Sequence, residues 1–319
     1  MKRIEEMPEL LRDFLVYMET IKGKSPKTVD EYYLDLRMFF RYMLIIKGVF
    51  SRDDDFSKIP IKEIDLPFVK KITISDIYDF LIYLSSKNLK ATSRARKICA
   101  IRMFFKYLTN KKQLLEVNPA QELETPKTKS SLPRYLSLEQ SIDLLKSVDG
   151  ENKERDYAIL LLFLTCGLRL SELVSLNYNC INDDGSILIL GKGNKERTVY
   201  VNDECIKAVN AYKLKRPIDG VKDKNALFLS KQLKRISPKT VQWLVKRYIK
   251  LAGLDESQFS VHKLRHTAAT LMYRNGVDVR TLKDLLGHQN LNTTQIYTHV
   301  SDNELKKAAD LNPLSHIKK

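Results

Sequence analysis

A segment rich in proline, serine, threonine and lysine divides this chain of 319 residues into two parts. The segment follows Asn118-Pro119 and runs "ELETPKTKSSLPRYLS", a composition typical of a linker. Each flanking part has the size of an ordinary domain, which is about 100–200 residues. The sequence therefore predicts one domain over residues 1–124, a linker over 125–133 and a second domain over 134–319.

The first part shows the periodicity of amphipathic helices, because its apolar residues recur three and four positions apart. The stretch over residues 48–71 contains two prolines and mixed charges, and it predicts a long loop or insertion. Four helices are expected, over about Pro8–Lys22 and Pro26–Lys47, from near Ser75, and after a cap at Thr92.

The fourth of these helices lies in the most basic stretch of the chain. Nine basic residues and no acidic residue occur between Lys87 and Leu115. One face of the helix is apolar, so we expect the basic residues to lie off that face and to contact phosphates, although a merely solvated basic face fits the pattern equally well. The candidate DNA-binding residues are Arg94, Lys97, Arg102 and Lys106.

The second part is expected to be mainly helical with one small sheet, which makes the whole chain mainly α, in the α+β class. Two short strands joined by "GKGN" are expected near Ser186–Leu190 and Arg197–Val201. Helices are expected at about Leu138–Val148, Arg155–Cys166, Asp203–Lys215, Pro238–Gly253, Val261–Asn275, Val279–Leu286 and from Asn303.

The charge of the chain favours a polyanionic partner. Lys and Arg number 55 against 39 for Asp and Glu, a formal net charge of +16. Nucleic acid is the first candidate and an anionic membrane surface the second. The longest apolar run, Ala158–Leu164, is far shorter than the roughly 18 residues of a membrane span. The first residues do not resemble an export signal, and the four cysteines are scattered, so we expect reduced thiols in the cytoplasm.

Two segments of the second part carry candidate catalytic cations. In "LLLFLTCGLRLSEL", Arg169 leaves an apolar helix and has Glu172 three residues later. The two residues could form a buried ion pair, or Glu172 could hold Arg169 toward a substrate phosphate. In "SILILGKGNKERTVYV", Lys192 lies at the turn of an expected β-hairpin. It is either an exposed turn lysine or a proton donor that reaches into a cleft.

A third segment, "SVHKLRHTAATLMYRNG", places His262, Arg265 and His266 within a sector of roughly 100° on one helix. Two histidines four residues apart suggest a zinc site. The glutamate of an HExxH motif is replaced by Lys263, however, and Arg265 would repel a dication, so no metal site is expected.

A fourth segment, "LLGHQNLNTTQIYTHV", contains His288 and Tyr297. A lone tyrosine would be ascribed to packing, and His299 is ascribed to packing or to the surface. Together with the arginines, the lysine and the other histidines, Tyr297 instead suggests phosphodiester chemistry in which arginines supply the charge that a metal ion would otherwise provide.

The motifs "GLRLSEL", "GKGNKER", "HKLRHTAATLMYRNG" and "LLGHQNLNTTQIYTHV" resemble, in order and spacing, those of the tyrosine recombinase (phage integrase) family. The likeness covers essentially the whole chain and is greatest to the Xer-type site-specific recombinases. It implies a four-helix core-binding domain of SAM-like fold and a helical catalytic domain with a small antiparallel sheet, forming a clamp around DNA. It also implies catalysis without metal, ATP or any other cofactor.

The resemblance assigns roles to the candidate residues. Tyr297 would be the nucleophile that forms an O-(3′-phospho-DNA)-tyrosine link, and Lys192 would protonate the departing 5′-oxygen. Arg169, Arg265 and His288 would contact the nonbridging phosphate oxygens, and His262 would take the tyrosine proton or orient the phosphate. Glu172 and His266 would support the site. The segment after Tyr297 is an expected short helix that packs on its own domain or on a neighbouring protomer.

The resemblance also implies a biological role and partners. The substrate would be double-stranded DNA at a specific recombination site, and exchange would proceed through a Holliday junction. A homo- or heterotetramer would assemble on two such sites, with a second recombinase and a DNA translocase as further partners. Chromosome dimer resolution is the expected role. Integration of a phage or conjugative element is the alternative with the same chemistry, and a non-catalytic DNA-binding protein is the alternative from another class.

Overall fold

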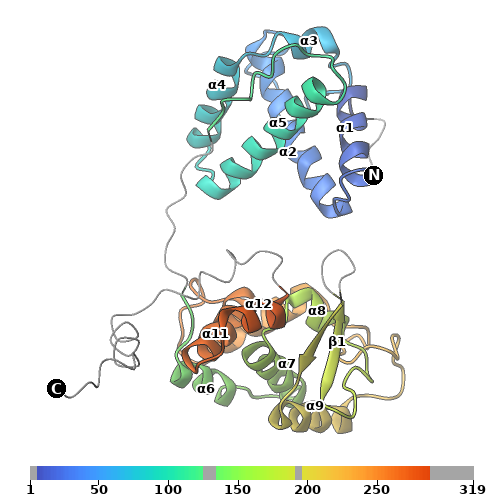
Figure 1. The fold of residues 1–319 in the computed structure, drawn as a ribbon, viewed down its shortest axis with the longest axis vertical. Helices are drawn as coiled ribbons and strands as arrows, with labels where there is room; N and C mark the ends of the chain where they lie inside the picture. Colours follow the sequence, from blue (N-terminus) through green and yellow to red (C-terminus); the bar gives the residue numbers. More distant parts are fainter. Residues whose placement is uncertain (1–5, 125–133, 191–195, 288–319) are drawn as a thin grey trace, which may run out of the picture. The chain divides into compact units, whose positions relative to one another are not determined.

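The computed structural model describes residues 6–124, 134–190 and 196–287. The chain forms two compact units, Met1–Ser130 and Ser131–Lys319, called here the N-terminal and the C-terminal unit (Figure 1). The predicted linker at residues 125–133 lies outside the described residues. Among the helices of the described ranges, none combines the length and apolar character that a membrane span requires.

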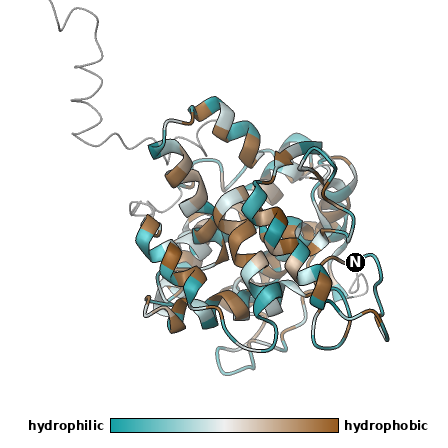
Figure 2. Cartoon of the chain, turned by 90° about the horizontal axis from the view of Figure 1, so that it is seen from below, coloured by the Kyte–Doolittle hydropathy of each residue, from teal (hydrophilic) through white to brown (hydrophobic). Residues whose placement is uncertain are grey.

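The N-terminal unit is a bundle of helices around an aromatic core. Helices of the chain carry both hydrophobic and hydrophilic residues, as amphipathic helices do (Figure 2). The core contains fully buried phenylalanines in edge-to-face contact, such as Phe14 with Phe104 and Phe39 with Phe80. The helices are α1 (Glu9–Thr20), α2 (Pro26–Ile46), α3 (Leu66–Lys70), α4 (Ile74–Ser86) and α5 (Ala91–Asn110).

The four predicted helices of this unit are confirmed, but residues 48–71 are more than a loop. This stretch contains the short helix α3, which begins at the cap Asp65, whose carboxylate accepts a hydrogen bond from the Phe68 amide at 2.8 Å. The stretch also buries apolar side chains in the bundle core, namely Ile59, Ile61, Ile64 and Val69. Prolines and charged residues lie between these apolar residues, so the sequence shows no regular apolar period that would predict their burial.

The capping residues set the helix starts of this unit. Helix α4 begins at Ile74, near Ser75 as predicted, because Thr73 and Asp76 form a reciprocal capping box. Helix α5 begins at Ala91, so Thr92 lies inside the helix and is not its cap. The start predicted for α2 is confirmed, with the Ser25 hydroxyl accepting from the Thr28 amide at 3.3 Å and Pro26 in the first turn.

In its described residues, the C-terminal unit is mainly helical with one antiparallel pair of strands, as predicted. In β1 and β2, Ser186 pairs with Tyr200 and Ile187 with Val199. Helix α8 was not predicted, and it follows directly on Arg169. The elements are α6 (Leu138–Lys146), α7 (Lys153–Cys166), α8 (Leu170–Ser175), β1 (Ser186–Leu190), β2 (Glu196–Tyr200), α9 (Asp203–Lys215), α10 (Pro238–Leu251), α11 (Val261–Arg274) and α12 (Val279–Leu286).

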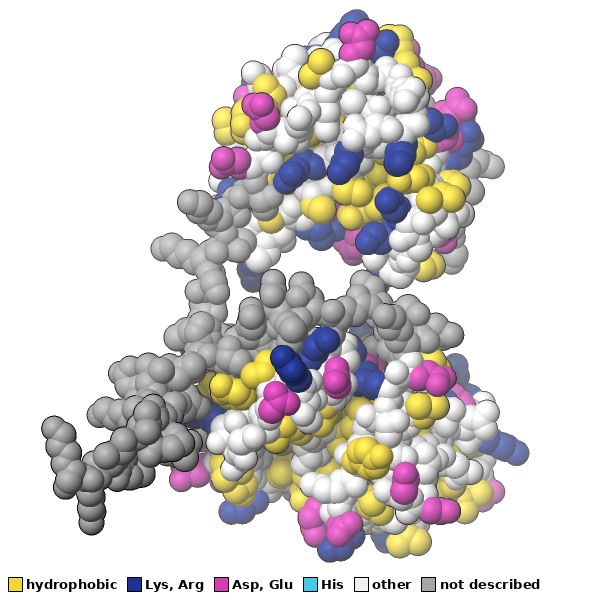
Figure 3. Space-filling view, viewed as in Figure 1, with side chains coloured by type: hydrophobic (Ala, Val, Ile, Leu, Met, Phe, Trp, Pro, Cys, Tyr) yellow, Lys and Arg dark blue, Asp and Glu magenta, His cyan; other side chains and the backbone are white. Residues whose placement is uncertain are grey.

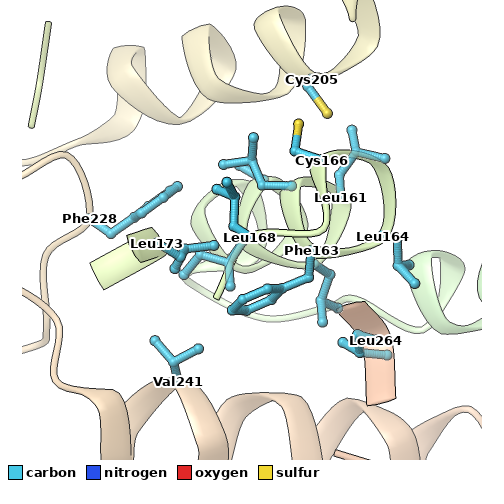
Figure 4. Close-up of a cluster of buried hydrophobic side chains, with 14 of the residues drawn as sticks. Leu161, Phe163, Leu164, Cys166, Leu168, Leu173, Cys205, Phe228, Val241 and Leu264 are labelled. Atoms are coloured by element: carbon cyan, nitrogen blue, oxygen red, sulfur yellow. The ribbon is translucent and has the colours of Figure 1, made fainter. Parts of the chain in front are cut away.

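Helix α7 is the centre of this unit. From Ala158 to Leu164 it is apolar on all sides, as expected of a helix surrounded by other elements, and it packs against both α9 and α11. Phe163 lies at the middle of the resulting cluster, with Val241 of α10 and Leu264 of α11 nearby (Figure 4). Helix α7 ends at Gly167, which adopts the left-handed conformation at φ 58°. The chain therefore turns sharply and delivers Arg169 to the start of α8.

Candidate active site

A buried carboxylate, that of Glu172, lies at the centre of the candidate site. Glu172 occupies the first turn of α8, and only 3% of the residue is exposed. Its Oε2 accepts from the backbone amide of Arg169 at 2.7 Å, and its Oε1 accepts from Nη1 of the same residue at 2.7 Å. Glu172 thus fixes both the start of α8 and the direction of the Arg169 side chain.

A second arginine on Glu172, Arg197, was missed by the sequence analysis. Arg197 lies on β2, and its Nη1 and Nη2 donate to Oε1 and Oε2 of Glu172 at 2.6 and 2.8 Å. Its Nε donates to the carbonyl of Leu285 at 2.9 Å. A signal for this residue was present, because the two-residue period of a strand places Arg197 on the same face as the buried Val199. An arginine on an inward face requires an acceptor.

The third arginine, Arg265 of α11, is 3% exposed. Its Nη1 donates to the carbonyl of Gly167 at 2.6 Å, and its Nη2 donates to that of Leu286 at 2.5 Å. Nη1 also lies 3.8 Å from Oε2 of Glu172. The structure therefore brings three of the candidate site residues, Arg169, Glu172 and Arg265, together.

Helix ends hold the arginines in place. Leu286 and Gly287 lie at the end of α12 and Gly167 at the end of α7, where the last carbonyls lack partners within the helix and the helix dipole is negative. Arg169 donates from Nη2 to the carbonyl of Gly287 at 2.6 Å. Both glycines have positive φ, and a Cβ atom would come within 3.0 Å of Leu286 at Gly167 and of Arg197 at Gly287. Glycine is therefore required at both positions.

The electrostatics of this cluster favour an anion. Burial alone would raise the pKa of Glu172, but hydrogen bonds from Arg197 and Arg169 outweigh it and lower the pKa to about 2. Glu172 is therefore ionised at neutral pH. Three guanidinium groups against one carboxylate leave an excess of positive charge in a partly dehydrated site, which an anionic ligand would neutralise. Arg169 exposes 34% of its side chain and is accessible to such a ligand.

His262 and His266 of α11 form a contact beside these cations. Their Nε2 atoms lie 3.1 Å apart, so one ring donates a hydrogen bond and the other accepts it. His266 is buried, whereas His262 lies at the surface. Dehydration, and then the charges of Arg265, Lys263 and Arg169, lower the pKa of His262. His262 is therefore neutral at pH 7 and able to accept a proton.

Several predicted site residues lie outside the described residues. These are Lys192, His288, Tyr297 and His299, together with the expected helix after Tyr297. The part of the site that the structure describes contains the phosphate-directed cations and the candidate base. Within the described ranges, no group of three His, Cys, Asp or Glu side chains is placed to hold a metal ion.

In the N-terminal unit, α5 presents the predicted basic residues in three different ways. Arg102 and Lys106 are exposed and line a hollow together with Cys99 and Asn118. Arg94 is half-buried and donates from Nη1 to the Ser85 hydroxyl at 2.6 Å. Lys and Arg side chains also gather around apolar side chains on one face of this unit (Figure 3). Arg102 and Lys106 are therefore available to a polyanion.

The prediction that Lys97 faces phosphates is wrong. Lys97 is 5% exposed, and its Nζ lies 2.7 Å from Oδ1 of Asp35, which is fully buried on α2. Lys97 precedes Ile101 by four residues and Phe104 by seven, so it lies on the core face of α5. The sequence did contain a sign of this pair, because Asp35 is a carboxylate within the apolar stripe of α2 and therefore needs a partner.

Comparison with known proteins agrees with this geometry. Residues 134–304 match the model of the phage integrase family, and residues 62–112 match that of the phage integrase N-terminal SAM-like domain. The chain is 51% identical to the tyrosine recombinase XerC of Caldanaerobacter subterraneus subsp. tengcongensis, over 97% of this chain and 88% of the relative. It is 36% identical to the tyrosine recombinase XerD of Haemophilus influenzae, over 90% of this chain and 91% of the relative.

Solved structures with a similar fold include two protein–DNA complexes. The XerH site-specific recombinase bound to its palindromic difH substrate has a TM-score of 0.71 at 22% identity, covering 94% of this chain and 84% of that protein. The Tn1549 transposon integrase in complex with circular intermediate DNA has a TM-score of 0.70 at 17% identity, covering 95% and 99%. At these identities the likeness concerns the fold.

Proposed function

Because the chain belongs to the phage integrase family, among its Xer-type tyrosine recombinases, we propose that Tyr297 is the nucleophile with which it cuts and rejoins DNA. The protein is a site-specific DNA strand transferase, and its partner is duplex DNA at a recombination site. The single observation that supports our residue assignment is the cluster of Arg169, Arg197 and Arg265 around the one carboxylate of Glu172. This excess of positive charge fits a scissile phosphate.

Arg169 and Arg265 hold the nonbridging oxygens of that phosphate by charge-assisted hydrogen bonds, which strengthen as negative charge builds up in the transition state. His288 donates to the same oxygens. Arg169 is the more accessible of the two arginines, and its bonds to Glu172 and Gly287 use two of the five N–H groups of a guanidinium. Glu172, Arg197 and the helix-end carbonyls keep both guanidinium groups in position before DNA binds.

The strand is cut when the Tyr297 oxygen attacks phosphorus and the bond to the 5′-oxygen breaks. The tyrosine proton passes to His262, which is neutral at pH 7, and Lys192 gives a proton to the departing 5′-oxygen. The resulting O-(3′-phospho-DNA)-tyrosine conserves the bond energy, so religation requires neither ATP nor a metal ion. His266 supports this step by its contact with the His262 ring.

The two units divide the work in this proposal. The domain over residues 1–124 binds the core of the recombination site, with Arg102 and Lys106 on DNA phosphates, and the domain over residues 134–319 carries the chemistry. The two domains, joined by a linker at 125–133, form a clamp around the duplex. Four protomers assemble on two sites, and the segment after Tyr297 contacts a neighbouring protomer.

Chromosome dimer resolution is the role we propose, since relatives that match at more than 30% identity over most of the chain include recombinases named XerC and XerD. Such a role involves a second recombinase and a DNA translocase. It also places the protein in the cytoplasm, where reductants return protein thiols to the free state that the four cysteines have in the structure. Genomic context separates this role from integration of a mobile element, because an integrase gene lies among phage or transposon genes.

The experiment that tests the nucleophile compares the wild type with Tyr297→Phe on a duplex nicked near the crossover. A cleaved strand on such a duplex diffuses away, so the covalent complex accumulates and survives denaturation. We expect this complex with the wild type, and normal DNA binding without it for Tyr297→Phe. A non-catalytic DNA-binding protein would give no complex with either form. A covalent complex with Tyr297→Phe would contradict the assignment of the nucleophile.

A further inference from the structure

Two buried cysteines, Cys166 and Cys205, face each other next to the candidate active site. Cys166 is the last residue of α7 and Cys205 lies in the first turn of α9; they are 3% and 0% exposed. Figure 4 shows their sulfur atoms pointing toward each other across the gap between the two helices. Both sulfurs also lie within 3.5 Å of one atom, the hydroxyl oxygen of Thr165.

The hydrogen bonds around Thr165 distinguish the two thiols. The Thr165 hydroxyl donates its single proton to the carbonyl of Leu161 at 2.8 Å. The Sγ atom of Cys205 lies 2.9 Å from the same oxygen and that of Cys166 lies 3.5 Å from it, so Cys205 is the thiol in closer contact with Thr165. A hydrogen bond from Cys205 also lowers the pKa of Cys166 and outweighs the opposite effect of burial. Cys166 is thus the better nucleophile of the pair, and Cys205 is the protonated partner.

Cys166 is covalently connected to the phosphate-directed arginines. The next residue, Gly167, offers the carbonyl that accepts from Nη1 of Arg265 at 2.6 Å, and Arg169 follows two residues later. Gly167 packs closely against α12, since a Cβ atom added at this position would lie 3.0 Å from the Leu286 side chain. A bond that pulls Cys166 toward α9 therefore changes the position of the carbonyl that orients Arg265.

We propose that Cys166 and Cys205 form a reversible intrachain disulfide, and that this bond slows DNA cleavage by displacing Gly167 and the arginine it orients. The oxidant is a small peroxide such as hydrogen peroxide. The Cys166 thiolate attacks one peroxide oxygen, and the O–O bond breaks. Hydroxide departs, and Cys166 becomes a sulfenic acid. The Cys205 sulfur then attacks Cys166, the S–O bond breaks, and the hydroxide leaves with the Cys205 proton as water.

The displacement follows from bond length. A disulfide holds its sulfurs about 2 Å apart, closer than two unbonded thiols can approach, so the side chains must rotate or the helix ends must move. Helices α7 and α9 are packed together and offer little freedom. The short segment between Cys166 and Arg169 is the part that can yield.

The test uses the full-length reduced protein treated with hydrogen peroxide and then with an alkylating agent. Peptide mass spectrometry should identify a peptide linked through Cys166 and Cys205, and dithiothreitol should release it. In Cys205→Ser we expect no link, and dimedone should label Cys166 as the trapped sulfenic acid. Cys180→Ser is the matched control, because Cys180 is partly buried elsewhere, and it should still form the link. Exposed Cys99 shows that the peroxide dose was effective.

The second measurement is the rate of covalent complex formation on nicked DNA. We expect oxidation to lower this rate roughly tenfold in the wild type, and dithiothreitol to restore it, with no such loss in Cys205→Ser. Circular dichroism establishes that this variant folds, and Cys205→Ala replaces it if it does not. Oxidation of Cys99 without a Cys166–Cys205 link would overturn the proposal. A link without a change of rate would overturn its coupling to the arginines.

The disulfide does not depend on the proposed function, since mass spectrometry detects it directly. Only its effect on cleavage does. If the reduced wild type formed no covalent complex, the proposed function would fail while the mass measurement still decided whether the link exists.

Discussion

Each unit of the molecule buries a carboxylate between two or more cations, Glu172 in one and Asp35 in the other, and the two clusters differ in charge balance. In the C-terminal unit, Glu172 faces three arginines. In the N-terminal unit, Asp35 lies 2.7 Å from Lys97 and 2.8 Å from Arg96, and Arg96 also contacts Glu31. In the N-terminal cluster, two cations balance two carboxylates, whereas the C-terminal cluster retains an excess of positive charge. The cluster with the excess charge is the one that fits an anionic substrate.

The pKa values of the two carboxylates reflect the same difference. For Asp35, burial raises the pKa and the neighbouring cations do not fully compensate. For Glu172, the arginines overcome burial and lower the pKa to about 2. Both carboxylates lie close to opposite charges. The two pKa values differ because the ionised form of Glu172 accepts more hydrogen bonds than that of Asp35. This comparison suggests replacements in pairs, one in each cluster.

The largest expected effect is that of Arg265→Lys on catalysis. Lysine keeps the charge but cannot bond to the carbonyls of both Gly167 and Leu286 with a planar fork. We expect covalent complex formation to slow roughly a hundred- to a thousandfold, with DNA binding retained. Arg96→Lys, the matched change in the N-terminal unit, should leave the rate within about twofold. Equal losses in both variants would remove the functional distinction between the clusters.

The next effect is that of Glu172→Gln on stability. Removing the charge leaves three guanidinium groups in the site without their shared acceptor. The lowered pKa corresponds to about 3 kcal/mol of unfolding free energy at neutral pH. Asp35→Asn should cost about 1 kcal/mol or less, because burial already disfavours the ionised form of Asp35. Urea unfolding measures both, with circular dichroism for the whole chain and fluorescence of the single tryptophan, Trp243, for the C-terminal unit.

The stability contributions of Glu172 and Asp35 should change with pH in opposite directions. Glu172 stabilises the folded state fully above its ordinary pKa of 4.5, and the contribution disappears as pH falls toward 2. The gap between the wild type and Glu172→Gln should thus be constant from pH 7 to 5 and shrink below 4.5. Asp35 has a raised pKa, so the wild type should gain stability relative to Asp35→Asn as pH falls from 7 toward 4. Parallel pH profiles would contradict the assigned difference.

A smaller effect is expected at His262, whose pKa is lowered by dehydration and then by the surplus cations. His262→Gln keeps a hydrogen-bonding side chain but cannot take a proton. We expect covalent complex formation to slow roughly a hundredfold, at the lower end of general-base effects. The wild-type rate should fall as pH drops through a value below 6.5, and this decline should be absent in His262→Gln. A decline that persists in the variant would assign the titration to another group.

The contrast between the clusters also shows what the sequence could and could not predict. Helices with a visible cap and end, such as α9 after Asn202 and α12 between Asp278 and Gly287, were predicted with their observed bounds. Arg169 and Glu172 were predicted as neighbours because they are three residues apart. Arg197 lies 25 residues from Glu172, and local periodicity gives no information on which distant carboxylate an inward arginine meets.

The same limit explains the error at Lys97. A helical wheel assigns a lysine to solvent by its polarity, but the buried Asp35 lies 62 residues away on another helix and changes that outcome. The assignments of Lys192, His288 and Tyr297 stay predictions based on motif order. The described residues support these assignments only indirectly, through the arginines and the histidine that would contact the proposed phosphate.

The smallest expected effect concerns DNA binding by α5, and it tests the comparison from the side of the N-terminal unit. Arg102→Ala and Lys106→Ala should each weaken binding to a duplex a few-fold and lower the slope of log affinity against log salt by about one, because each would remove one phosphate contact. Lys97→Met should leave the slope unchanged, since the Lys97 ammonium is paired with Asp35 in the core. Fluorescence anisotropy at several salt concentrations measures all three variants. If Lys97→Met lowered the slope as Arg102→Ala does, the Asp35 cluster would be open to DNA, and its charge balance would no longer mark it as structural.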